Sequence, residues 1–108
     1  MNLPTEIFHD VIVVHTPEEL SAEQCEAFAS YLPTLERKNI VVDLDHTETI
    51  DSRGLEALLN VQDKLRGENG DVKIATTNAN NRKILEITRL DQQLEVFENV
   101  IDAVKSFH

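Results

Sequence analysis

IVVDLDHTETIDSRGLEALL, residues 40–59, is the stretch that decides the fold, because the spacing of its apolar residues changes partway along it. In an extended chain, Ile40, Val42 and Leu44 fall on one face and Asp43 and Asp45 on the other, which predicts a strand over residues 40–45. From Leu55 onward the leucines recur at helical spacing, which predicts a helix over about residues 54–66. A strand that leads through a polar turn into a helix indicates an α/β fold.

Strands and helices continue to alternate on both sides of this stretch. Further strands are predicted at residues 7–8, 11–14, 72–76 and 94–97. Further helices are predicted from about residue 21 to Leu32, after residues 78–81 and around residues 100–107. The order ββαβαβαβα predicts a mixed sheet of four to five strands with about four helices mainly on one face.

Two details of this fold follow from local patterns. Cap patterns precede the first helix at both Thr16–Glu19 and Ser21–Gln24, and Pro33 is expected to end it. Asp43 and Asp45 alternate with the apolar residues of their strand, so we expect a sheet that is covered on one side only. The last helix is then expected to pack on the same core as the others.

Length and composition predict one domain, residues 1–108, in a reducing compartment. The 108 residues suit a single compact domain, and 41% of them are hydrophobic. The single cysteine, Cys25, excludes an internal disulfide. The N-terminal residues lack the basic and apolar segments of a secretion signal, and no apolar run approaches the roughly 18 residues that span a bilayer. We therefore expect a soluble, cytoplasmic protein without membrane insertion.

The charge of the chain bears on its partners. Ten basic and twenty acidic residues give a net charge of −10. Such a field repels nucleic acid and anionic lipid headgroups, so neither is expected as a partner.

We find no set of residues that predicts catalysis, a metal site or a cofactor. The three glycines match neither phosphate-binding loop pattern. The four histidines lie apart, at His9, His15, His46 and His108. Asp43, Asp45 and His46 come nearest to a ligand cluster, but side chains at the polar end of a strand are expected in solvent. Cys25 lies on an apolar helix face and is expected to be a small buried hydrophobe.

The segment from Ile50 to Leu55 is the candidate binding site, because it leads into the helix start, where free backbone N–H groups attract anions. Asp51 or Ser52 is expected to be the N-cap. Arg53 opposes the helix dipole, and Gly54 is a poor helix former. This pair favours a surface that displays positive charge and is approached closely. The alternative is a solvated arginine beside a glycine that packs on the sheet.

Residues 41–44 and 50–59 resemble the signature of STAS domains, a family shared by sulfate-transporter tails and anti-sigma-factor antagonists. The resemblance continues through residues 72–74, 84–91 and 94–104, and is weaker in the first third of the chain. It implies the STAS-like fold, a mixed sheet with helices mainly on one side.

The resemblance also implies a function. Anti-sigma-factor antagonists bind a kinase-like anti-sigma factor and are released when it phosphorylates the Ser or Thr directly before the glycine of Asp-Ser-Ser/Thr-Gly. Arg53 occupies that position here, so the usual phosphoacceptor is missing. Ser52 is a second candidate for phosphorylation, although we expect it to act mainly as a helix cap. The implied partner-binding residues are Asp51, Ser52, Arg53, Gly54 and Leu55.

Two other functions remain open at this point. A STAS scaffold subunit of a transporter or other multiprotein complex does not need phosphorylation, and Arg53 favours it. A small-molecule or nucleotide-binding sensor module needs a concave pocket. The oligomeric state is equally open.

Overall fold

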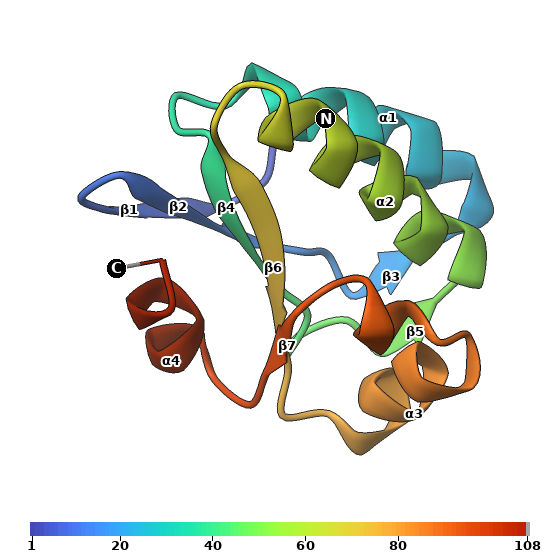
Figure 1. Cartoon of the computed structure of the whole chain (residues 1–108). Coiled ribbons are helices and arrows are strands. Elements are labelled where there is room, and N and C mark those ends of the chain that lie inside the picture. The colour runs from blue at the N-terminus through green and yellow to red at the C-terminus, as the bar shows by residue number, and fades with distance from the viewer. Residues whose placement is uncertain (108) are drawn as a thin grey trace.

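A five-stranded sheet forms the centre of residues 1–107, which the computed structural model describes apart from the Thr49 side chain (Figure 1). His108, one of the scattered histidines, lies outside the described residues. The spatial order of the strands is β1-β2-β4-β6-β7. Their bounds are Thr5–Phe8 for β1, Val11–His15 for β2, Asn39–Asp43 for β4, Asp71–Ala75 for β6 and Val96–Phe97 for β7. Only β1 is antiparallel to its neighbour, so the predicted mixed sheet is confirmed.

The helices fall between the strands in the predicted order. The α-helices of the described chain are α1 (Cys25–Tyr31), α2 (Ser52–Arg66), α3 (Ala79–Ile87) and α4 (Val100–Lys105). Short 3₁₀ turns are η1 (Ala22–Gln24), η2 (Leu32–Thr34) and η3 (Leu90–Gln92). Pro33 lies in η2 directly after α1, as expected for a residue that ends a helix. None of the helices described here is long and apolar enough to cross a membrane.

The first of the two predicted cap patterns is not a helix start. Glu19–Leu20 forms a short strand, β3, which pairs in parallel with β5 (Thr49–Ile50). Leu20 is fully buried, and the Thr47 hydroxyl donates to the Pro17 carbonyl, so contacts with a distant segment hold this stretch extended. The helical region begins only after Ser21, whose N–H donates to Gln24 Oε1.

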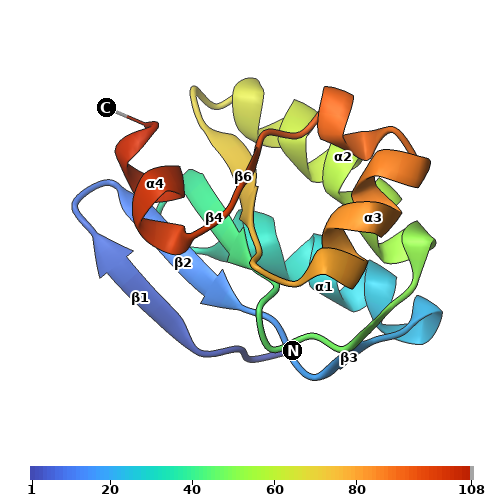
Figure 2. The same ribbon diagram turned by 90° about the horizontal axis from the view of Figure 1, so that it is seen from below.

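The expectation of a sheet covered on one side is wrong. The larger core lies between the sheet and α1, α2 and α3, and it includes Ile12, Val42 and Ile74. The opposite face carries Val11, Val13, Val41 and Ala75, which pack against Ala103. Ala103 belongs to α4, which lies across the sheet from the other α-helices (Figures 1 and 2). The last helix therefore covers a second, separate core. Central parallel strands are commonly buried on both faces, and the continuous run of β-branched residues in β2 fits that pattern.

The last predicted strand is shorter than its apolar pattern suggested. Only Val96 and Phe97 pair with β6, while Leu94 before them is buried against the larger core. β7 thus ends the sheet beyond β6, and β1 is the opposite edge.

Candidate functional site

Asp51 is the N-cap of α2, and the expectation that Ser52 acts mainly as the cap is wrong. The Asp51 N–H donates to the Leu20 carbonyl at 3.0 Å, which holds residue 51 in an extended conformation. Its Oδ1 accepts from the Arg53 N–H at 2.8 Å. Ser52 is then the first helical residue, and its exposed hydroxyl has no hydrogen-bond partner within the described chain. A cap needs the extended backbone that only Asp51 has.

The N-cap Asp51 also forms an ion pair with Arg53. Arg53 Nε lies 3.3 Å from Asp51 Oδ1, while the Arg53 side chain remains 72% exposed. Two hydrogen bonds lower the pKa of Asp51. The larger effect comes from the Arg53 backbone N–H and the smaller from the Arg53 guanidinium. The cation is therefore tolerated in the first turn and still faces solvent.

Gly54 is explained by packing, although its neighbours are α1 and the short strand β3 rather than the five-stranded sheet. A Cβ at position 54 would lie 3.1 Å from Cys25 Sγ and 3.6 Å from the Leu20 side chain. Cys25 is buried as predicted, and this burial raises the pKa of its thiol. Leu55 is fully buried, so its side chain packs in the core beneath the exposed residues of the site. The surface of the predicted site thus consists of Ser52, Arg53 and part of Asp51.

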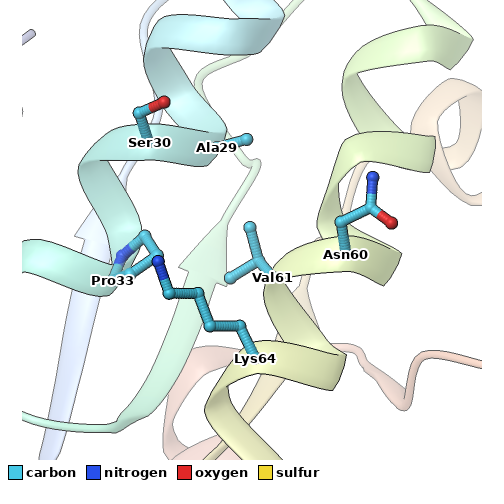
Figure 3. A pocket seen from close by; sticks show the side chains of 6 residues that line it. All are labelled: Ala29, Ser30, Pro33, Asn60, Val61 and Lys64. Carbon is cyan, nitrogen blue, oxygen red and sulfur yellow. The ribbon is translucent and has the colours of Figure 1, made fainter.

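Two adjoining hollows continue from Arg53 between α1 and α2, and we call them together the α1–α2 groove. The first has a volume of about 470 Å³ and is lined by Ala22, Cys25, Glu26, Ala29, Arg53, Glu56, Ala57 and Asn60. The second, of about 250 Å³, is lined by Ala29, Ser30, Pro33, Asn60, Val61 and Lys64. Figure 3 shows Lys64 reaching across it toward Pro33. In the sequence, the small residues of both helices are only an indirect sign of this groove.

The expectation that Asp43 lies in solvent is wrong. Asp43 is 5% exposed, and its Oδ2 lies 2.7 Å from His15 Nδ1. Asp45 accepts from the Thr77 N–H at 2.6 Å, whereas His46 is exposed. The three residues do not converge, and no group of three or more His, Cys, Asp or Glu side chains within residues 1–107 could hold a metal ion.

His15 is the residue that sequence reasoning missed. Its Nε2 lies 2.7 Å from Glu6 Oε1, so one ring bridges two carboxylates. Burial alone would lower the pKa of His15, but the hydrogen bonds with Glu6 and Asp43 outweigh it and raise the pKa above its usual value. Alternation along β2 puts His15 on the face of Val11 and Val13, but only the strand register brings both carboxylates to it.

Comparisons with known proteins agree with this fold. The family model of the STAS domain matches residues 2–103. No protein of curated function matches the sequence at a significant level. Among solved structures, an anti-sigma factor antagonist from Mycobacterium paratuberculosis superposes with a TM-score of 0.83 at 22% identity, covering 97% of this chain and 92% of that chain.

Two further structures share the fold. The Bacillus cell fate determinant SpoIIAA in its phosphorylated form has a TM-score of 0.70 at 15% identity, covering 99% of this chain and 100% of that chain. A sulfate transporter family protein from Wolinella succinogenes has a TM-score of 0.74 at 15% identity, covering 94% of this chain and 87% of that chain. At such identities the likeness concerns the fold. Since the family model spans residues 2–103, the chain belongs to the STAS domain family.

Proposed function

We propose that this STAS domain is a non-catalytic regulatory module that binds another protein through the start of α2, in the manner of anti-sigma-factor antagonists. The partner is a kinase-like anti-sigma factor or a related regulator. The observation that carries the proposal is the exposed pair of Ser52 and Arg53 in the first turn of α2. This is the family's motif position, and here it displays a positive charge.

The surroundings of this pair support a role in recognition. Leu55 and Gly54 are buried behind it, so the first turn of α2 is held against the core. The N-terminus of α2 adds its partial positive charge to that of Arg53. An acidic group on the partner would gain hydrogen bonds from the guanidinium, which is mostly exposed before binding. The α1–α2 groove offers room for a partner side chain next to this contact.

A scaffold subunit of a transporter or other complex is the second candidate. Arg53 favours it, because a scaffold has no need of the missing phosphoacceptor. The likeness of fold to a sulfate transporter family protein is compatible with it. A sensor of small molecules would use the hollow beside Arg53, whose lining includes Glu26 and Glu56. Such a lining disfavours nucleotides and other anions.

The test uses the wild-type domain and two charge-reversed variants as bait. Arg53→Glu reverses the proposed contact, while Lys105→Glu reverses an exposed charge on α4, across the sheet from α2. Proteins captured from a lysate of the source cells are identified, and the affinity of each purified candidate is then measured. We expect one partner to bind the wild type and Lys105→Glu but to lose at least about tenfold in affinity, roughly 1.4 kcal/mol, for Arg53→Glu.

The identity of that partner separates the candidates. A sigma-factor regulator supports the first function, and a transporter subunit supports the second. A partner that binds Arg53→Glu as tightly as the wild type would show that the start of α2 is not the contact.

A further inference from the structure

A single histidine ties three adjacent strands together on the α4 side of the sheet. His15 ends β2, and its two ring nitrogens lie 2.7 Å from Glu6 on β1 and 2.7 Å from Asp43 on β4. The strand register explains the meeting, since Glu6 pairs opposite Val13 and Asp43 pairs with His15. We call these three residues the carboxylate–histidine bridge.

The number of protons in this bridge follows from its geometry. An ionised carboxylate only accepts hydrogen bonds, and a neutral imidazole has one N–H donor and one acceptor nitrogen. Two carboxylates on opposite sides of one ring therefore require both ring nitrogens to carry protons. His15 is a cation whenever both contacts are made.

The two halves of the bridge differ in burial. The Asp43 side chain is 7% exposed, whereas that of Glu6 is 58% exposed. An unpaired charge is far more unfavourable in the interior than in water. When His15 loses a proton, the remaining one therefore stays on Nδ1 facing Asp43, and the bond from Nε2 to Glu6 is lost.

β1 is the element that depends on this bond. It is an edge strand whose four residues are all exposed, and among the described residues it pairs only with β2. Beyond it, β2 carries the fully buried residues Val11, Val13 and Val14. An open β2 edge would present backbone groups for pairing with another chain.

We propose that protonation of His15 fastens the edge strand β1 to the sheet, and that loss of this proton loosens β1 and makes the β2 edge accessible while the rest of the sheet holds. This proton-dependent device is independent of the proposed partner site at the start of α2.

The charged groups around His15 make the carboxylate–histidine bridge the element that controls its protonation. Glu6 and Asp43 are the charged groups that act on His15. The helix packed over this face, α4, presents apolar residues to it, and Lys73 on β6 is engaged with Ser106 and Glu95. Because the pKa of His15 is raised in the folded state, the stabilisation is complete below the ordinary value of 6.5 and is lost as pH rises through the folded pKa.

The test follows His15 and β1 by NMR as pH is raised. We expect the His15 ring to titrate with a midpoint above 6.5, both nitrogens protonated below it and only Nδ1 above it. The hydrogen-exchange protection of the β1 amides, corrected for the intrinsic effect of pH, should fall several-fold through the same midpoint, while that of the β6 amides is unchanged. A midpoint at or below 6.5, a remaining proton on Nε2, or constant protection of β1 would each overturn the proposal.

Two variants isolate the bridge. Glu6→Gln can accept from a protonated Nε2 or donate to a neutral one, so β1 protection should no longer change across the titration. His9 lies in the turn between β1 and β2, and within the described chain its side chain forms no hydrogen bond or ion pair, while its carbonyl accepts from Arg37. His9→Asn should therefore keep the pH dependence of the wild type. Loss of that dependence in His9→Asn, or its persistence in Glu6→Gln, would contradict the assignment to His15.

Discussion

Arg53 and Gly54 each look unfavourable for the first turn of a helix, and both are compensated by a contact with a single neighbour. The guanidinium of Arg53 pairs with the carboxylate of Asp51. Gly54 leaves the space that the Cys25 sulfur of α1 occupies. At both positions, a residue that is unfavourable in the first turn of a helix is thus offset by a contact that helix propensity scales do not include.

Gly54→Val tests the close approach of α2 to α1. The added side chain would overlap the Cys25 sulfur, and overpacking of this kind destabilises by about 1–3 kcal/mol. Urea denaturation followed by circular dichroism measures the change in the free energy of unfolding. In a Cys25→Ala background the loss should be smaller, because the sulfur is absent. An equal loss in both backgrounds would show that the sulfur is not the obstacle.

Arg53→Ser tests the reading of the phosphorylation motif. Successive helical residues point about 100° apart, so the Ser52 hydroxyl does not face where the family's phosphoacceptor would. We therefore expect a kinase-like partner with ATP to phosphorylate Arg53→Ser at position 53 and to leave the wild type unmodified. Mass spectrometry maps the phosphate, and the double variant Ser52→Ala, Arg53→Ser serves as the control. Stoichiometric phosphate on Ser52 of the wild type, with loss of partner binding, would mean that the switch has moved by one residue.

At the scale of elements, α4 is held by a buried lysine beneath its end. Six residues are too few for a stable isolated helix. Lys73 Nζ donates to Ser106 Oγ at 2.8 Å and to the Ser106 carbonyl at 3.2 Å, and it lies 4.3 Å from the centre of the Phe107 ring. The lysine of a central strand therefore anchors the helix that covers its face.

Lys73→Met should loosen α4 selectively. Methionine keeps the apolar stem but loses the hydrogen bonds and the cation–π contact, a change of about 1–2 kcal/mol. Hydrogen exchange should show reduced protection of the α4 amides, with the α2 amides unchanged. Lys105→Met, which changes an exposed lysine of the same helix, is the control. Equal loss of protection in α2 and α4 would show that Lys73 supports the whole fold.

At the scale of the whole molecule, the net charge of −10 governs how partners approach. The long-range field attracts a partner with a basic patch and acts over about 8 Å at physiological ionic strength. Local contacts such as that of Arg53 take effect only after this approach.

Raising the salt concentration should therefore slow association with the partner. The rate is measured by stopped-flow mixing over a series of NaCl concentrations, with the dissociation rate followed in parallel. We expect the association rate to fall with ionic strength while the dissociation rate changes less, because screening acts mainly on the approach. An association rate that is indifferent to salt would show that the net charge does not steer this complex.

The sequence by itself determined the kinds of elements and their order. The alternation over residues 40–45 and the leucine spacing after Leu55 are local patterns, and both predicted elements are present as β4 and α2. Residues 41–44 and 50–59 likewise predicted the family, because they lie close together in the chain. Such features can be predicted from the sequence because each depends on residues within one or two turns of one another.

The tertiary structure decided everything that depends on which segments become neighbours. Pairing of β3 with β5 made Asp51 rather than Ser52 the cap, and turned one apparent helix start into a strand. Asp43 is buried on the face of the sheet that α4 covers, a face that the sequence pattern had assigned to solvent. The bridge through His15 joins Glu6 to Asp43, residues 37 positions apart, because β2 lies between their strands in the sheet. Local periodicity carries no information on such register, so only the assembled sheet brings the three side chains together.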